Sequence, residues 1–235
     1  MANDLQSSPN DPPAAVGEKI LALRAEVEIA ASRLRLAKAP PVLVAVTKKV
    51  PEAAIREALE TGQRVFGENR VQEAAEKWPA LRDAYPDIEL HLIGPLQTNK
   101  VKQAIGLFDV IETLDRPKLA KALARERNDG ARLPRLFVQV NTGEEAQKAG
   151  VLPAETGAFL ALCRNELGLV PEGLMCVPPV EEEAALHFAL LHEIARANAL
   201  EGLSMGMSGD YETALNFGAS HVRLGTAIFG PRGEA

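Results

Sequence analysis

The chain is poor in cysteine and has no long apolar run, and each shortage excludes a class of protein. Only two cysteines, Cys163 and Cys176, occur among its 235 residues. They are too few for a disulfide framework and do not have the spacing of metal ligands. We expect both thiols to lie in the core of a protein that works in a reducing cytoplasm. No stretch approaches the roughly 18 apolar residues that a membrane-spanning helix needs.

Basic residues are not in excess either, because the net charge is −6 at pH 7 and the pI is about 5.4. A broad surface for nucleic acid or an acidic membrane needs a basic excess that neutralises phosphates. We therefore expect neither nucleic acid nor a membrane as a partner. A single small anionic ligand is compatible with this charge.

Residues 1–15 are rich in Ser, Asn, Asp and Pro. They lack the apolar core of a signal peptide and the arginine-rich pattern of a transit peptide. We expect a disordered N-terminal tail over 1–15. With 46% hydrophobic residues, the remainder can bury a good core, and we expect residues 16–235 to form a single domain.

From residue 16 onward the chain alternates between helical and extended patterns. A first helix is predicted over Val16–Leu36, with Ile20, Leu23, Val27 and Leu34 on one stripe. Short, mostly apolar segments typical of buried parallel strands follow at Val42–Thr47, Arg64–Phe66, Glu89–Ile93, Asp109–Glu112, Leu136–Val140, Gly173–Val177, Leu203–Met205 and His221–Leu224. Helices are predicted after the first seven of these segments, at Pro51–Thr61, Arg70–Asp83, Asn99–Gly106, Arg116–Arg127, Pro153–Leu167, Glu181–Asn198 and Gly209–Phe217.

This alternation predicts an α/β fold, a closed (β/α)₈ TIM barrel with an extra N-terminal helix, in preference to a doubly wound open sheet. The residues with chemical potential follow the first, second, seventh and eighth strands. In a closed barrel the C-terminal ends of those strands are neighbours, and phosphate sites commonly lie in the loops after strands seven and eight.

Lys48 directly follows the first predicted strand. A lysine at a strand end is more often a solvated surface charge than a nucleophile, but the mouth of a barrel is where a chemical lysine would lie. The segments Met205–Asp210 and Val222–Thr226 are small, donor-rich loops typical of a phosphate cradle. A lysine beside such a cradle suggests pyridoxal phosphate (PLP), whose aldehyde condenses with an amine while its phosphate needs N–H and hydroxyl donors.

The residues of the cradle have two interpretations each. Ser208, next to Met207, caps the helix that begins near Gly209, or it donates to a phosphate at that helix N-terminus, and the two roles are compatible. Arg223 is either a buried partner of a carboxylate or a contact of the cofactor's pyridine nitrogen, where a cation would make the ring a weaker electron sink. In the second case Gly225 and Thr226 supply N–H and hydroxyl groups to the phosphate.

Other polar residues at the predicted mouth are also ambiguous. Asn69 either caps the helix after the second strand or leans toward the cofactor ring. For Gln97, Asn99 and Lys100 we favour a capping role over a role in the site. Lys148, in a loop bounded by glycines, either lines the mouth or is solvated.

Five ordered motifs give the chain a family resemblance over nearly its whole length from Val42. They are Ala45–Lys48, Phe66–Asn69 with Gln72–Glu73, His91–Lys100, Leu203–Ser208 and Val222–Gly230. In these motifs the chain resembles the pyridoxal-phosphate homeostasis proteins, also known as the proline-synthetase-co-transcribed family. Such an ordered set of motifs is highly specific.

The resemblance implies a barrel like the N-terminal domain of alanine racemase, that is, a PLP fold type III-like domain. It implies that the cofactor is attached to Lys48 as a Schiff base, that Ser208 and Gly225–Thr226 hold the phosphate, and that Arg223 meets the ring nitrogen. Many relatives carry a second lysine two positions after the first. This chain has Val50 there, so a role for that second lysine in cofactor transfer is not carried over.

The resemblance further implies a carrier or buffer in intracellular PLP homeostasis that affects amino-acid and keto-acid balance without established turnover, with apo PLP-enzymes as recipients. A two-base racemase needs a second acid/base group, which alanine racemases take from an additional β domain, and we do not expect this chain to contain such a domain. The alternative is an enzyme, a slow racemase or a Schiff-base lyase, that uses Lys48 chemically. A weaker alternative is a regulatory module that senses cofactor. We expect a cytoplasmic monomer.

Overall fold

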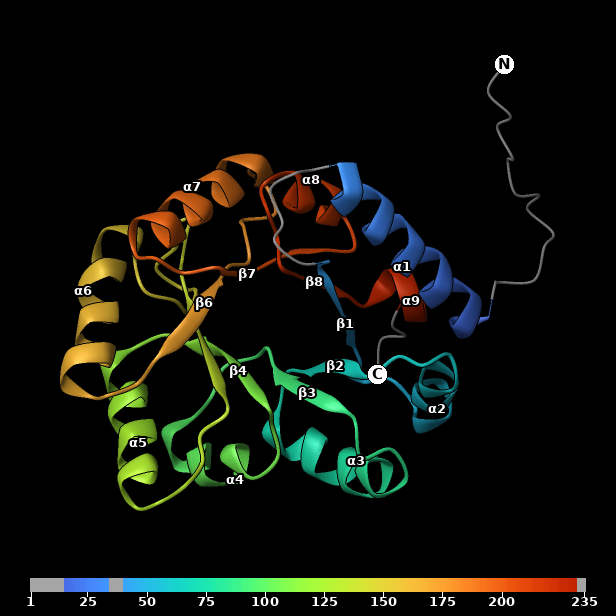
Figure 1. The fold of residues 1–235 in the computed structure, drawn as a ribbon, viewed down its shortest axis with the longest axis horizontal. Helices are drawn as coiled ribbons and strands as arrows, with labels where there is room; N and C mark the ends of the chain where they lie inside the picture. The colour runs from blue at the N-terminus through green and yellow to red at the C-terminus, as the bar shows by residue number, and fades with distance from the viewer. Residues whose placement is uncertain (1–14, 34–39, 232–235) are drawn as a thin grey trace.

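The computed structural model describes residues 15–33 and 40–231, and in them eight parallel strands form a closed barrel (Figure 1). Each strand pairs with the next in chain order, and β8 pairs with β1 to close the sheet. The strands are β1 (Val42–Val46), β2 (Val65–Glu68), β3 (Glu89–Leu92), β4 (Val110–Leu114), β5 (Arg135–Gln139), β6 (Pro171–Met175), β7 (Gly202–Met207) and β8 (His221–Leu224). Every predicted strand overlaps one of them, which confirms the (β/α)₈ barrel.

Helices surround the barrel and follow the predicted segments closely. They are α1 (Val16–Arg33), α2 (Glu52–Glu60), α3 (Val71–Ala84), α4 (Val101–Ile105) after the short η1 (Thr98–Lys100), α5 (Pro117–Asn128), α6 (Thr156–Ala161) between η2 (Pro153–Glu155) and η3 (Leu162–Glu166), α7 (Ala184–Ala197), α8 (Tyr211–Asn216) and α9 (Thr226–Phe229). The sequence did not predict α9. The predicted tail over 1–15, except for its last residue, and the predicted end of the first helix at Leu36 lie outside the described residues.

The extra helix α1 packs on the outside of the barrel against α2, α8 and α9 (Figure 1). Ile20, Leu23 and Val27 are buried, as the predicted stripe requires. The Tyr211 hydroxyl of α8 donates to Glu26 of α1 over 2.7 Å. The helix therefore covers the seam where the last strands of the barrel meet the first.

The apolar core consists of two separate clusters. The larger one lies between the strands and the helices and contains Phe66 and Trp78, whose ring centroids are 4.9 Å apart. The smaller one consists of Val110, Phe137 and Met175, on β4, β5 and β6. Because this second cluster is small, polar side chains also occupy buried positions on the barrel strands.

Both cysteines are buried, as predicted. Burial raises the pKa of Cys163 to about 11 and that of Cys176 to about 12. At neutral pH these groups are thiols, which are poor nucleophiles and poor metal ligands. Across residues 15–33 and 40–231 no helix is long and apolar enough to cross a membrane, and no cluster of His, Cys, Asp or Glu side chains could hold a metal ion.

Candidate cofactor-binding site

Lys48 lies where β1 leaves the barrel. Thr47 is fully buried, Lys48 is partly buried, and the Val50 N–H donates to the Thr47 carbonyl over 3.0 Å to close a turn. Lys49 occupies the left-handed region at φ 57°, which is unusual for a residue with a side chain. Val50, which closes the turn, is buried.

Helix α3 braces this turn from the side. The carboxylate of Glu73 accepts a hydrogen bond from the Lys49 N–H over 2.6 Å, and Lys77 donates to the Thr47 carbonyl over 2.8 Å. Lys77 also forms ion pairs with Glu73 and with the fully buried Glu68. Burial raises the pKa of Glu68, while the ammonium of Lys77 opposes that rise. These contacts fix the backbone that carries Lys48.

A cavity of about 700 Å³ opens beside Lys48, on the side of β1, β2 and β3. No described residue forms an ion pair or a side-chain hydrogen bond with the Lys48 amine. The amine is therefore free to react with, or bind, a ligand in this cavity. Its lining is Lys48, Asn69, Arg70, Val71, Gln72, Pro95, Gln97 and Lys100.

The cavity changes the interpretation of the polar residues after β2 and β3. Capping by Asn69 was wrong, because the N-cap of α3 is Arg70 and no side chain caps it. Capping by Gln97 was also wrong, since it precedes η1 without a side-chain cap bond and lines the cavity together with Lys100. Asn99 does not line the cavity.

Lys148 is neither free nor part of the cavity. Its ammonium forms an ion pair with Glu145 over 2.5 Å and a long hydrogen bond of 3.5 Å to the Pro178 carbonyl. It is therefore unlike Lys48, whose amine has no partner of this kind among the described residues.

Ser208 joins the loops that follow β7 and β8. Its hydroxyl oxygen accepts hydrogen bonds from the N–H groups of Gly225, over 3.3 Å, and Ala227, over 3.2 Å. The predicted capping of the next helix was wrong, because the N-cap of α8 is Asp210 and no side chain caps it. The hydroxyl lies instead at the start of α9, where Gly225 is the N-cap and the exposed Thr226 is the first residue.

Met207 ends β7 with a side chain that is 37% exposed, and its N–H donates to the carboxylate of Asp210 over 2.6 Å. Strand β8 pairs with both β1 and β7, so the loops at Ser208 and Gly225 are neighbours of the turn at Lys48. None of the predicted residues after β7 or in β8 lines the 700 Å³ cavity. The predicted site thus lies at one end of the barrel in two groups.

Arg223 is buried on β8. One of its terminal nitrogens donates to the Ser204 hydroxyl over 2.6 Å and the other to the Cys176 carbonyl over 2.7 Å. Its guanidinium also lies 3.8 Å from the carboxylate of Glu112. The structure therefore shows the buried arginine paired with a carboxylate, and contact with a cofactor ring nitrogen stays a prediction.

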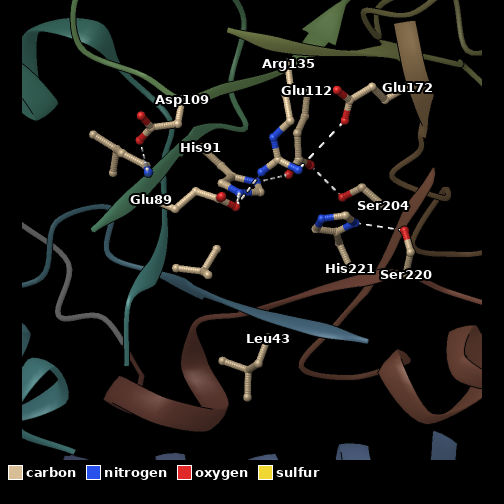
Figure 2. A network of polar contacts seen from close by, with 12 residues as sticks. Leu43, Glu89, His91, Asp109, Glu112, Arg135, Glu172, Ser204, Ser220 and His221 are labelled. Carbon is tan, nitrogen blue, oxygen red and sulfur yellow. Dashed lines mark hydrogen bonds and ion pairs between the residues drawn. The ribbon is translucent and has the colours of Figure 1, made fainter. Parts of the chain in front are cut away.

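The carboxylate of Glu112 belongs to a buried polar network that crosses the barrel (Figure 2). It accepts from the Ser204 hydroxyl over 2.5 Å and contacts Nδ1 of His91 over 2.6 Å. Nε2 of His91 lies 2.8 Å from Glu89, which pairs with Arg135 over 2.7 Å. Because β4 is adjacent to neither β7 nor β8, these contacts can only pass through the interior of the barrel.

The network holds alternating charges. Burial lowers the pKa of His91, but hydrogen bonds to Glu112 and Glu89 outweigh that effect and raise it. Both ring nitrogens face carboxylates, which accept but cannot donate when ionised, so His91 is an imidazolium. Although burial would raise the pKa of Glu112, the hydrogen bond with His91 and the charges of His91 and Arg223 hold it at about 2.

This network was not predicted from the sequence. One signal was available, since His91, Glu112 and Arg223 are ionisable residues inside predicted buried strands, and buried charges are paired. The same reasoning predicts pairing in general, but not which of these residues meet.

Comparison with known proteins places the chain in a class. The family model described as alanine racemase, N-terminal domain, matches residues 21–233. The closed parallel barrel with a lysine at the end of β1 therefore belongs to the alanine racemase N-terminal class of barrels.

Relatives define the family more narrowly. A pyridoxal phosphate homeostasis protein of Vibrio cholerae serotype O1 is 35% identical over 227 residues, covering 92% of this chain and 96% of the relative. The protein of the same name from Escherichia coli K12 is 36% identical over 228 residues, covering 92% and 97%. The chain belongs to the pyridoxal phosphate homeostasis protein family.

Two solved structures of a similar protein have the same fold. PipY of Synechococcus elongatus PCC7942 has been solved without PLP and with PLP bound. The two structures match with TM-scores of 0.80 and 0.78 at 37% and 36% identity, and each match covers 92% of this chain and all of PipY.

Proposed function

We propose that this chain binds PLP through a Schiff base on Lys48 and acts as a carrier or buffer in PLP homeostasis, without robust catalysis. It would be a cytoplasmic monomer that affects amino-acid and keto-acid balance and passes its cofactor to apo PLP-enzymes. The observation that carries the proposal is the amine of the partly buried Lys48, which has no ion pair or side-chain hydrogen bond among the described residues. It lies at the mouth of a barrel whose neighbouring loops present N–H donors.

The residues present fit this cofactor. Lys48 offers a primary amine for an aldehyde, and PLP supplies an electron-withdrawing ring when bound. The Ser208 hydroxyl and the N–H groups of Gly225 and Thr226 would hold the phosphate, at the place where Ser208 now accepts from Gly225 and Ala227. Asn69, beside Lys48 in the cavity, would orient the ring.

Arg223 and Met207 complete the proposed site. Arg223 would face the ring nitrogen as a permanent cation, and its ties to Ser204 and the Cys176 carbonyl would fix its position. Met207, partly exposed at the end of β7, would pack against the cofactor. A cation at the ring nitrogen opposes ring protonation, which favours storage over carbanion chemistry.

The lining of the cavity also favours a carrier. In the part of the chain that the structure describes, no histidine, tyrosine, cysteine or carboxylate lines it, and Lys100 is the sole amine besides Lys48. A racemase needs two acid/base groups on opposite faces of its substrate. The choice therefore depends on whether Lys48 and Lys100 can act as that pair.

One experiment separates the carrier from the enzyme. The protein is incubated with PLP, desalted and mixed with an apo PLP-enzyme, and the return of that enzyme's activity is followed. In parallel, L-alanine is incubated with the loaded protein, and D-alanine and pyruvate are measured. We expect reactivation of the apo-enzyme and no turnover above that of Lys48→Ala. Steady turnover above this control, or failure to reactivate the apo-enzyme, would contradict the proposal.

A further inference from the structure

The cavity beside Lys48 contains more positive charge than the cofactor uses. Three of its eight lining residues are cations, namely Lys48, Arg70 and Lys100, and three more are amides. None is a carboxylate. The chain as a whole has a net charge of −6, so this local excess of positive charge runs against its composition.

These cations form no ion pair within the described part of the chain, although Arg70 interacts electrostatically with the nearby carboxylate of Glu73. Among residues 15–33 and 40–231, neither Lys48 nor Lys100 has an ion pair or a side-chain hydrogen bond, and Arg70 has no ion pair. The carboxylate of Glu73, which follows Arg70 on α3, is already bound by the Lys49 N–H and by Lys77. A concave site with uncompensated charge of one sign concentrates ligands of the opposite sign.

The phosphate of the proposed cofactor does not account for this charge. Its donors are at Ser208, Gly225 and Thr226, which do not line the cavity. The volume of about 700 Å³ lies within the range of small-molecule sites, roughly 300–1,000 Å³, and so exceeds the space that a single inorganic ion needs.

We infer that this cavity is a second binding site, for a small organic oxyanion, next to the anchoring lysine. Phosphate monoesters and carboxylates share the chemistry that it would recognise, and a phosphate monoester, with a charge of about −2, matches Arg70 and Lys100 better than a monocarboxylate does. Arg70 would bind the oxygens in fork geometry, Lys100 would act as a point charge, and Gln97 would orient the remainder of the molecule. The site goes beyond the proposed function, because Arg70 and Lys100 are not among the residues proposed to hold PLP.

Calorimetric titration tests this site with two probes. sn-Glycerol 3-phosphate represents phosphate monoesters, and N-acetylglycine represents carboxylates without an amine that could react with PLP. Titrations use the full chain at low ionic strength in a buffer without phosphate. We expect glycerol 3-phosphate to bind more tightly. Tighter binding of N-acetylglycine would support the second site but assign it to carboxylates instead of phosphate monoesters.

Two variants of equal charge decide where the probe binds. Lys100→Gln removes a lining cation, whereas Lys102→Gln removes an exposed cation of α4 that does not line the cavity. We expect Lys100→Gln to weaken binding of the preferred probe by about tenfold, and Lys102→Gln by less than about twofold. Equal effects of the two variants, or no binding of either probe to the wild type, would overturn the inference.

Titrations of the PLP-loaded protein and of Ser208→Ala separate this inference from the proposed function. We expect the probe to bind both. Complete loss of probe binding on loading would mean that bound PLP fills the cavity, which overturns the second site. A protein that binds the probe but not PLP would overturn the proposed function and leave the second site intact.

Discussion

A single glycine controls how closely two loops of the candidate site approach. A Cβ atom added at Gly94 would lie 2.2 Å from the carbonyl oxygen of Asn69 and 2.7 Å from its Cα, so the two segments can meet only without a side chain there. Because backbone atoms are rigid neighbours, a methyl group would push Asn69 away from its place in the cavity.

We therefore predict that Gly94→Ala lowers the free energy of unfolding by about 1–3 kcal/mol and weakens PLP binding. Urea denaturation and a PLP titration measure the two effects. Gly209→Ala is the matched control, since a Cβ there meets nothing within 4 Å. A Gly94→Ala protein as stable as Gly209→Ala would contradict the close approach.

At the scale of residues, the sequence predicted the candidate site residues better than it predicted their hydrogen-bond partners. The position of Lys48 followed from the end of an apolar strand, because the next residue outward reaches the mouth of a barrel. The capping roles given to Asn69, Gln97 and Ser208 followed local rules and were wrong. Capping depends on where a side chain finds its donors, and Ser208 finds them 17 and 19 residues away.

At the scale of elements, the brace between α3 and the turn after β1 positions the candidate anchor. Lys77 is 16% exposed and neutralises Glu68, which is fully buried. Removal of the cation would leave a buried carboxylate whose remaining side-chain donors, among the described residues, are the Thr47 hydroxyl and the Trp78 N–H.

We predict that Lys77→Met lowers the free energy of unfolding by roughly 3–5 kcal/mol, as expected when one partner of a buried ion pair is removed. Glu68→Gln in the same chain should restore part of the loss, because it removes the unpaired charge. Urea denaturation at pH 7 measures both variants. Arg56→Met, which breaks an exposed pair with Glu52 on α2, should cost less than about 0.5 kcal/mol, and a similar cost for Lys77→Met would refute the brace.

The elements themselves were predicted well for a physical reason. Buried parallel strands are continuously apolar, and their helices carry a clear stripe, so both patterns are visible in short windows. Helix α9 was missed because its four residues, Thr226–Phe229, are too few to show a period. It matters for the site, since its first N–H groups are the donors that Ser208 contacts.

At the scale of the whole molecule, the buried polar network makes the stability of the barrel depend on pH. Glu112 and Glu89 have pKa values of about 2 in the fold, below the ordinary 4.5, so their contribution to stability is present above pH 4.5 and is lost as pH falls through 2. The pKa of His91 is raised, so its contribution is complete below pH 6.5 and is lost as pH rises through its folded value.

His221 has the opposite shift, because burial lowers its pKa to about 4. Burial disfavours the protonated form of His221 in the folded state. The free energy of unfolding should therefore decline as pH falls from 6.5 to 4. We predict that His221→Asn reduces this decline, whatever its effect on stability at pH 7. Urea denaturation of both proteins at several values between pH 4 and pH 7 gives the slopes, and equal slopes would show that His221 does not cause the decline.

The contacts of Glu112 with Ser204 and Arg223 could not have been predicted from sequence, because only closure of the barrel brings their strands to face one another. Ser204 and Glu112 are 92 residues apart and lie on strands that do not pair. Strand order places such residues inside the same barrel, and their rotamers determine which of them form contacts. The barrel as a whole was predictable, and pairing of Arg223 with a carboxylate was one of its two interpretations, but the identity of that carboxylate, Glu112, was not predictable.

The most direct test of the account is the visible absorption of three proteins that have been incubated with PLP and desalted. These are the wild type, Lys48→Ala, and Lys49→Ala as a control at the adjacent exposed lysine. We predict that the wild type and Lys49→Ala remain yellow and retain PLP covalently after borohydride reduction, while Lys48→Ala is colourless. A colourless wild type would contradict PLP binding, and a Lys48→Ala protein as yellow as the wild type would show that another lysine is the anchor.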